Sequence, residues 1–284
     1  MHTRIIYIIG LGRSGTTLLD IVLGNAANTL SCGELNRYPY EKGYPYQYPE
    51  DHPAQRLWTG LRDEFEALNP EINWGRMTQL HRKFEFHERF ILNYFKLYSR
   101  KDFSDYIKFV EDVYELIAKR TGAATLIDSS KYAGRALSLS RSEKLGVSYL
   151  YIKRRPSAVV NSFSKKDVEQ NSKSWLSANA YYFLASTLCK IAYRTLKGRH
   201  RCLSVRYEDL MSDPQTHFEN IGETLGFDTS DIVKKLKNNE PFSGGTIYYG
   251  NRVRLQNEVT LRPASEKPKG LGALLTDAIN YIHY

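Results

Sequence analysis

One short segment constrains this chain more than any other. Residues 10–17 read GLGRSGTT, directly after the apolar run IIYII and directly before LLDIVLG. The run before the loop predicts a buried strand, and the residues after it predict the start of a helix. A glycine-rich turn between a strand and a helix aims backbone N–H groups and a helix N-terminus at one place, which favours phosphate binding. The sequence therefore predicts an anion site at the end of the first strand.

This loop departs from the nucleotidase pattern at one position. That pattern is G-x-x-x-x-G-K-[ST], in which the lysine reaches the β- and γ-phosphates and the final hydroxyl holds magnesium. Here Thr16 replaces the lysine, Thr17 keeps the hydroxyl, and Arg13 lies inside the loop. The chain thus keeps the phosphate cradle and lacks the side chain that serves a nucleoside triphosphate.

Short β-branched runs alternate with helical patterns along the chain. Strands are predicted at 4–9, 29–32, 124–128, 147–153 and 201–206, and helices at 16–24, 104–120, 134–145, 157–167, 174–197 and 214–225. This alternation is typical of a parallel sheet with helices on both faces, in which ligands bind at the carboxyl ends of the strands. We expect one α/β domain of P-loop-like fold over residues 1–284, with a variable insert at about 36–103.

Two parts of the insert differ in composition. Residues 36–53 are crowded with tyrosine and proline, which predicts an ordered loop near the mouth of the site, and residues 55–103 predict a polar helical segment. The loop tyrosines are candidates for stacking on an acceptor ring: Tyr38, Tyr40, Tyr44, Tyr46 and Tyr48. Beyond the insert, Ser104 is the expected N-cap of the next helix, and the uncharged stretch from Ser174 to Cys189 predicts a core helix.

Charge and cysteine content limit the environment of the protein. Forty Lys and Arg against 31 Asp and Glu give a net charge of +9, which favours anionic partners without choosing among a nucleotide, an acidic polymer, nucleic acid and a membrane surface. Cys32, Cys189 and Cys202 form no C-x-x-C pair, so a reducing compartment is expected. With a strand beginning at Arg4 and no stretch of ~20 apolar residues, we expect a cytoplasmic protein without a signal peptide or membrane span.

The segment G-x-x-R-S-G-T-T-L-L resembles the 5′-phosphosulfate loop of sulfotransferases that use 3′-phosphoadenosine 5′-phosphosulfate (PAPS), with the closest likeness to their carbohydrate and tyrosylprotein branch. The resemblance implies a P-loop-like sulfotransferase fold, PAPS as donor, 3′-phosphoadenosine 5′-phosphate as product and no metal. Such a donor has no γ-phosphate for a lysine to reach. The donor-binding residues that it implies in this loop are Arg13, Ser14, Gly15, Thr16 and Thr17.

Three later segments extend the resemblance in the order of the family. YIKRRPSAVVNSFSKK supplies Arg154 and, eight residues on, Ser162 as the implied 3′-phosphate ligands, with Lys166 one turn further along the same helix. RYEDL contains Tyr207, which the family brings to the nucleotide, and GNRVR resembles a lid over the donor. The implied lid residues are Gly250, Asn251 and Arg254. Arg155 stands where the family has aspartate, which leaves its role open.

The chemistry of sulfuryl transfer needs a base for the acceptor hydroxyl and positive charge at the leaving oxygen. Glu34, in SCGELN, resembles the base of the tyrosylprotein enzymes, and Lys131, in LIDSSKYAGRAL, matches the family's catalytic lysine. Arg13 and Lys131 would then stabilise the leaving group. Three histidines of the insert compete for the role of base: His52, His81 and His87.

The turn that carries Lys131 holds further polar residues. We expect Asp128 to orient the turn through hydrogen bonds, and Ser129, Ser130 and Arg135 are candidates to face the acceptor.

These features predict an enzyme that transfers a sulfuryl group from PAPS to a hydroxyl, first of all on a carbohydrate. A phenol or another small alcohol is the second choice of acceptor, and a peptide tyrosine is the third. Two readings from other classes stay open: a P-loop nucleotide kinase or NTPase, which would depend on magnesium, and a non-catalytic protein that binds nucleotides or polyanions. No nucleic-acid partner is expected, and the sequence leaves the oligomeric state open.

Overall fold

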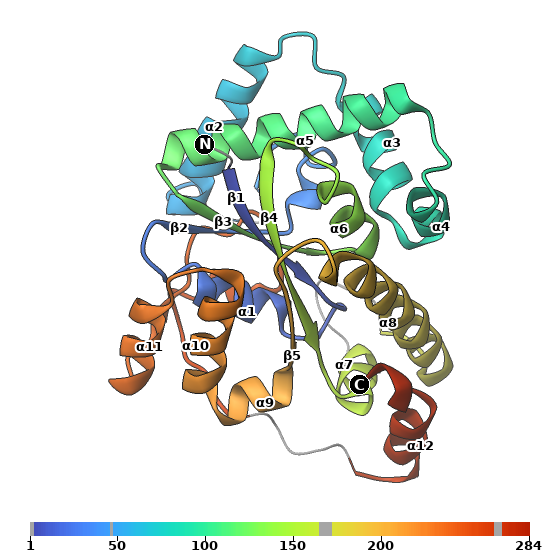
Figure 1. Ribbon diagram of the computed structural model, residues 1–284. Coiled ribbons are helices and arrows are strands. Elements are labelled where there is room, and N and C mark those ends of the chain that lie inside the picture. The colour runs from blue at the N-terminus through green and yellow to red at the C-terminus, as the bar shows by residue number, and fades with distance from the viewer. Residues whose placement is uncertain (1–2, 46–47, 165–171, 264–268) are drawn as a thin grey trace.

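A five-stranded parallel sheet forms the centre of the protein. The computed structural model describes residues 3–45, 48–164, 172–263 and 269–284. The strand order is β2-β3-β1-β4-β5, and each neighbouring pair is parallel (Figure 1). The strands are β1 Thr3–Ile9, β2 Thr29–Gly33, β3 Thr125–Lys131, β4 Leu145–Lys153 and β5 Cys202–Arg206. Two further strands of two residues each, β6 Phe242–Ser243 and β7 Glu258–Val259, pair with each other in a separate sheet.

Helices fill most of the remaining described chain. The longer ones are α1 Thr16–Leu23, α2 Pro53–Leu68, α3 Trp74–Glu85, α5 Arg100–Thr121, α7 Pro156–Ser164, α8 Trp175–Lys197, α10 Pro214–Leu225, α11 Ser230–Lys237 and α12 Leu271–Ile279. The shorter ones are α4 Phe90–Tyr94, α6 Ala133–Leu139, α9 Tyr207–Ser212 and the 3-10 turns η1 Leu35–Arg37, η2 His87–Arg89, η3 Arg252–Leu255 and η4 Tyr281–His283. The predicted α/β fold with helices around a parallel sheet is confirmed.

The buried part of the central strand β1, residues 5–9, is covered by helices on both faces of the sheet. Successive side chains of a strand point to opposite faces of the sheet. Ile5, Tyr7 and Ile9 lie in one buried cluster with residues of α5, α6 and α8, whereas Ile6 and Ile8 lie in another with α1, α10 and α11. Figure 1 shows these two helical layers on either side of the sheet. A strand that is covered on both faces carries mainly apolar side chains, and the one buried hydroxyl here, that of Tyr7, donates to Tyr132 O at 2.9 Å.

The strand order sets where a ligand can bind. The chain passes from β1 to β2 and β3 on one side and then to β4 and β5 on the other, so β1 lies between β3 and β4. In open parallel sheets, such a reversal leaves a crevice at the carboxyl ends of the two diverging strands. The glycine-rich loop follows β1 at this point.

The structure corrects two predicted helix boundaries and describes a third predicted helix in part. The helix expected from Ser104 begins at Arg100, because Ser99 is its N-cap and accepts a hydrogen bond from Asp102 N. The helix expected to reach residue 145 ends at Leu139, since Ser142 Oγ accepts from Leu145 N in a turn that leads into β4. The helix expected over 157–167 is described from Pro156 to Ser164, and its last predicted residues lie outside the described chain.

The tyrosine-rich loop is also corrected. Tyr38 and Tyr48 are buried rather than available to an acceptor: the Tyr38 ring packs against Phe65 and Tyr248, and Tyr48 Oη donates to Ile247 O at 2.7 Å. Tyr46 lies outside the described residues. Among the described helices, none is both long and apolar enough to cross a bilayer.

Candidate active site

A cavity of about 370 Å³ opens at the carboxyl ends of β1, β3 and β4. Segments from the whole length of the chain meet there. Its walls include residues of the glycine-rich loop, of the turns after β2 and β3, and of later segments: Gly12, Arg13, Gly15, Thr16, Thr17, Glu34, Arg37, Lys131, Arg154, Ser162, Tyr207, Tyr249, Gly250 and Asn251. Most of the residues singled out in the sequence therefore lie around one space.

The glycine-rich loop holds two residues in the left-handed region of backbone conformation. Gly15 has φ 95°, and a Cβ there would lie 2.6 Å from the ring of Tyr207, so only glycine fits. Arg13 has φ 68°, which is uncommon for a residue with a side chain. Ser14 Oγ is buried and donates to Leu11 O at 2.7 Å, so it supports the turn from within. The turn leads into α1, whose first residues line the cavity.

Glu34 and Lys131 form an ion pair at the cavity wall, in which the ammonium donates to Glu34 Oε1. Glu34 follows β2, and its backbone N donates to Tyr249 O at 2.8 Å. Lys131 ends β3 with φ 64°. A non-glycine residue held in this conformation costs of order 1 kcal/mol, which the surrounding structure must compensate.

Arg154 also lines this cavity, and it connects the glycine-rich loop to Tyr207. Its Nη1 donates to Arg13 O at 2.9 Å, and its guanidinium lies 4.3 Å from the centre of the Tyr207 ring. Its Nε is buried and has no hydrogen-bond partner among the described residues. Ser162, on α7, lines the same cavity, whereas Lys166 lies outside the described residues.

The segment around Tyr249 forms the wall of the cavity next to α1. Tyr248 N donates to Cys32 O at 2.9 Å, and Asn251 N donates to Thr17 Oγ1 at 3.3 Å, so the segment joins the end of β2 to the glycine-rich loop. Gly250 and Asn251 thus reach the cavity as expected. Arg254 does not: it is 1 % exposed, and its guanidinium lies among Tyr48, Tyr249 and Gly250 O.

A second cavity of about 360 Å³ adjoins the first and shares Gly12, Glu34, Arg37 and Lys131 with it. Its other walls are aromatic or basic: His87, Tyr132, Phe163, Lys173 and Tyr181. The Phe163 and Tyr181 rings meet edge to face at 5.3 Å, and Lys173 Nζ lies 5.6 Å from the Tyr181 ring. The Glu34–Lys131 pair therefore lies between the two cavities.

A buried ionic network supports this region from beneath. Arg135 donates to Glu85 and to Asp128, and both the guanidinium and the two carboxylates are buried. Asp128 also accepts from Ser130 N at 2.6 Å, as expected of a residue that orients the turn. The expectation that Ser129, Ser130 and Arg135 face an acceptor is wrong, because all three side chains are enclosed by protein.

The structure separates the three candidate histidines. His52 Nδ1 accepts from Ala54 N and caps α2, and His81 is buried, with a pKa that burial lowers to about 3. Neither lines either cavity. His87 does line the second cavity, with Nδ1 buried and without a hydrogen-bond partner among the described residues, and burial lowers its pKa.

Asp20 was not singled out in the sequence. It connects the end of β2, which precedes Glu34, to β3, which ends at Lys131. This residue of α1 is fully buried, and its Oδ2 accepts from Gly33 N at 2.9 Å and from Ser129 Oγ at 2.6 Å. Burial raises its pKa from 3.8 to about 8. From α1, Asp20 therefore holds Gly33, next to Glu34, and Ser129, two residues before Lys131.

Arg37 and Tyr181 also escaped the sequence reasoning. Arg37 lines both cavities, and its guanidinium lies 4.9 Å from the Tyr249 ring. Its position three residues after Glu34, on the turn η1, is the signal that could have found it. Tyr181 gave no such signal, because it lies within a helical pattern whose orientation only the packing of α8 decides.

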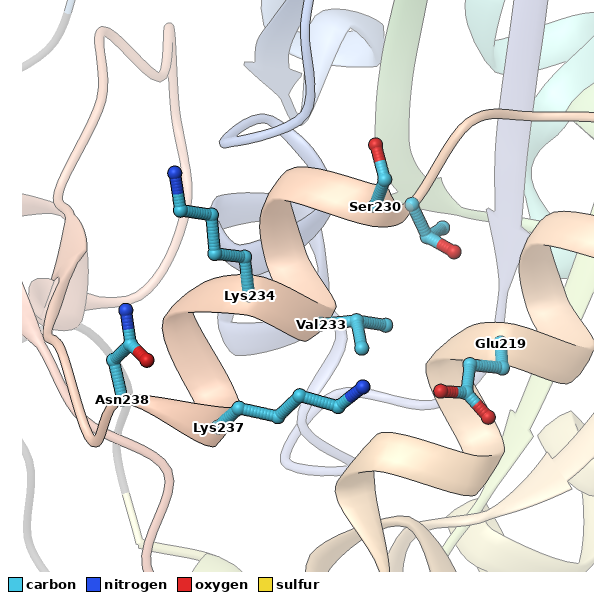
Figure 2. A pocket seen from close by; sticks show the side chains of 7 residues that line it. Glu219, Ser230, Val233, Lys234, Lys237 and Asn238 are labelled. Carbon is cyan, nitrogen blue, oxygen red and sulfur yellow. The ribbon is translucent and has the colours of Figure 1, made fainter.

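A shallower hollow of about 500 Å³ lies between α10 and α11 (Figure 2). Lys237 extends across it towards Glu219, and Val233 forms part of its floor. None of the residues predicted for the site lines it, and it lies away from the carboxyl ends of the strands. We therefore place the candidate active site in the two adjoining cavities, although this hollow has the larger volume.

No sequence-family profile and no curated protein matches the chain. Among solved structures, the chain is similar to the sulfotransferase domain from the curacin biosynthetic pathway, with 17 % identity, a TM-score of 0.53 and coverage of 97 % of this chain and 96 % of that one. A sulfotransferase domain from the olefin synthase of Synechococcus PCC 7002 has 21 % identity, a TM-score of 0.47 and coverage of 98 % and 94 %. Sulfotransferase STF1 from Mycobacterium tuberculosis H37Rv has 16 % identity, a TM-score of 0.48 and coverage of 86 % and 73 %.

The chain is therefore an α/β protein with a parallel sheet and a glycine-rich loop at its switch point. More particularly, its fold is the sulfotransferase fold, as the likeness to the curacin-pathway domain over nearly its full length shows.

Proposed function

We propose that this protein is a PAPS-dependent sulfotransferase that acts on a hydroxyl of a small acceptor. One observation carries the proposal. The six segments that resemble the family's motifs meet around one cavity, and the Glu34–Lys131 pair lies where that cavity adjoins a second one. Two adjoining cavities with an acid–base pair between them suit a donor, an acceptor and the transfer of a group from one to the other.

The first cavity fits an anionic nucleotide. Thr16 and Thr17, at the N-terminus of α1, line it, and Arg154 Nε is buried without a partner among the described residues. The N-terminus of α1 and Arg13 would hold the 5′-phosphosulfate, and Arg154 with Ser162 would hold the 3′-phosphate by charge-assisted hydrogen bonds. PAPS, when bound, supplies an activated sulfuryl group whose leaving oxygen belongs to a phosphate.

The second cavity would hold the acceptor. In the proposed step the acceptor oxygen forms a bond to sulfur while the bond from sulfur to the phosphate oxygen breaks, and the hydroxyl proton moves to Glu34. Lys131 and Arg13 would stabilise the charge that develops on the leaving oxygen. Glu34 as base is favoured over His87 because its carboxylate lies on both cavities and next to Lys131, whereas His87 lines the second cavity only.

The aromatic side chains that line the second cavity indicate which class of acceptor it would hold. Tyr132, Phe163 and Tyr181 offer ring faces and edges, on which a sugar ring or a phenol can stack. Tyr38 and Tyr48, two of the five tyrosines offered for stacking on an acceptor, are buried, so the tyrosine-rich loop no longer favours carbohydrate over a phenol. Both a monosaccharide and a phenol are therefore acceptors to be tested, and a volume of about 360 Å³ suits a molecule of that size.

The direct experiment incubates the purified protein with sulfur-labelled PAPS and a panel of sugars, phenols and tyrosine peptides, with and without EDTA. We expect label to appear in an acceptor at the same rate in both conditions. Hydrolysis of ATP that EDTA abolishes, with no transfer from PAPS, would instead identify a P-loop NTPase. Tight binding of the nucleotide with no turnover on any acceptor class would identify a binding protein.

A further inference from the structure

The last helix of the chain is amphipathic in the reverse of the usual sense. A helix packed on a protein normally buries its apolar stripe and exposes its polar one. In α12 and the following turn η4, Thr276, Asn280 and His283 are buried, whereas the apolar side chains face solvent. Leu271 is 73 % exposed and Tyr281 78 %, and the other exposed members are Leu274, Leu275, Ile279 and Ile282.

Specific polar contacts hold this orientation. Asp277 Oδ1 accepts from Ser157 N at 2.8 Å, and Thr276 Oγ1 accepts from Trp175 Nε1 at 3.0 Å. Asn280 Nδ2 donates to Asn179 Oδ1 at 3.1 Å. Rotating α12 to bury its leucines would break these bonds and leave buried polar groups without partners, which is costly. The outward apolar face is therefore built into the fold.

Helix α8 extends the apolar face. Its exposed side chains include Leu176, Phe183 and Leu184, at the spacing of one helical stripe, so the expected core helix is only half buried. The Phe183 ring lies 4.8 Å from the His283 ring, so α8 adjoins the turn η4 that follows α12. Ten of the sixteen large apolar side chains that are exposed in the described chain lie on α8, α12 and η4, and we call this set the α8–α12 face.

Cations outnumber carboxylates on the segments that carry this face, although Glu208, on α9, accepts a hydrogen bond from Tyr284 Oη at 2.9 Å. The described residues 172–197 and 269–284 contain the cations Lys173, Lys190, Arg194, Lys197 and Lys269, and only one carboxylate side chain, that of Asp277, which accepts from Ser157 N. A second copy of the chain packed on the same face would bring like charges together. An anionic lipid surface would instead attract them, while its acyl region would take up the leucines.

From this combination we propose that the α8–α12 face is a peripheral membrane-binding surface for anionic phospholipid. A helix of nine residues is too short to span a bilayer and suits a position in the plane of the headgroups. Trp175 and Tyr281 are 41 % and 78 % exposed at the face, and Trp175 Nε1 donates to Thr276 Oγ1. Both residue types are typical of side chains at a membrane–water boundary. The proposal is independent of the sulfuryl-transfer reaction.

Vesicle flotation of the purified full chain tests it. We expect binding to vesicles of phosphatidylcholine with phosphatidylglycerol, weaker binding to phosphatidylcholine alone, and loss of the difference at high salt. Replacing two exposed leucines, by L271E with L274E, should weaken binding by about tenfold or more, because each leucine would bury its apolar side chain in the bilayer of the bound state. The matched control is L68E with L97E, two leucines that are 63 % and 64 % exposed elsewhere and whose replacement should leave binding unchanged.

A charge-reversal pair separates the electrostatic part. R194E with K197E, in the last turn of α8, should weaken binding to the anionic vesicles, and K234E with K237E, in the last turn of α11, should not. The fluorescence of Trp175 should shift to the blue on vesicle addition. No binding by the unaltered chain, or equal binding by L271E/L274E, would overturn the proposal. Light scattering that shows a dimer lost in L271E/L274E, without vesicle binding, would assign the face to a second copy instead.

Discussion

Lys131 donates its ammonium hydrogen bond to Glu34 Oε1, and so joins the end of β3 to the turn after β2. The contact crosses 97 residues of sequence and lies on the boundary between two cavities. In the structure each group is neutralised by the other. A reaction that moves a proton to Glu34 would release Lys131 to a neighbouring negative charge, which couples the two roles in the proposed step.

The first prediction separates those roles by kinetics. Glu34→Gln keeps the shape of the side chain and removes proton acceptance, so turnover should fall by ~10²–10⁴ with nucleotide affinity nearly unchanged. Lys131→Ala should also slow turnover. Acceptors with more acidic hydroxyls need less help from a base, so they should partly restore Glu34→Gln and leave Lys131→Ala slow. Turnover of Glu34→Gln at the unaltered rate would move the role of base to His87.

The second prediction concerns the phosphate ligands. Arg154→Ala should weaken binding of 3′-phosphoadenosine 5′-phosphate by roughly ten- to hundredfold, because an arginine–phosphate contact contributes about 1.5–3 kcal/mol. Ser162→Ala should weaken it by less. Calorimetry with the bisphosphate measures both. Arg155→Ala is the control, since the described contact of Arg155 to Glu208 is made by its backbone N, and equal losses in Arg154→Ala and Arg155→Ala would argue against a specific phosphate contact.

The third prediction uses two glycines of the same loop. Gly15→Ala places a Cβ 2.6 Å from the Tyr207 ring at φ 95°, so it should distort the loop and weaken nucleotide binding by about tenfold or more. Gly12→Ala places its Cβ 3.5 Å from Phe163, which is an ordinary contact, and nucleotide affinity should change little. Equal affinities of the two variants for the bisphosphate would contradict a nucleotide seated on this loop.

The fourth prediction concerns pH. Burial raises the pKa of Asp20 from 3.8 to about 8, so the folded chain keeps a proton on this carboxyl that the unfolded chain loses. The stability that it contributes is therefore fully present below about pH 4 and is lost as the pH rises towards 8. Asp20→Asn cannot titrate, so its free energy of unfolding relative to the unaltered chain should increase with pH across that window.

Urea unfolding of Asp20→Asn at several pH values measures the effect. Asp228→Asn is the control, because this exposed carboxyl has a lowered pKa and loses its contribution only in acid. A constant difference between the unaltered chain and Asp20→Asn from pH 5 to pH 8 would mean that Asp20 is ionised in the folded protein.

The sequence by itself determined the class of fold and the place of the glycine-rich loop. Local pattern suffices for these, because a buried parallel strand needs an unbroken apolar run such as IIYII, and a tight turn before a helix needs glycine at Gly15. The spacing of Arg154 and Ser162 follows likewise from a strand end and the helix after it.

Only the tertiary structure decided which side chains reach the site. Arg254 and Arg135 carry the same charge as Arg154 in the sequence, yet they are enclosed by aromatic rings or carboxylates from distant segments. The second cavity, the role of Asp20 and the outward apolar face of α12 arise in the same way. Each depends on contacts between residues far apart in the chain, and the orientation of a helix about its own axis is fixed by its partners rather than by its own period.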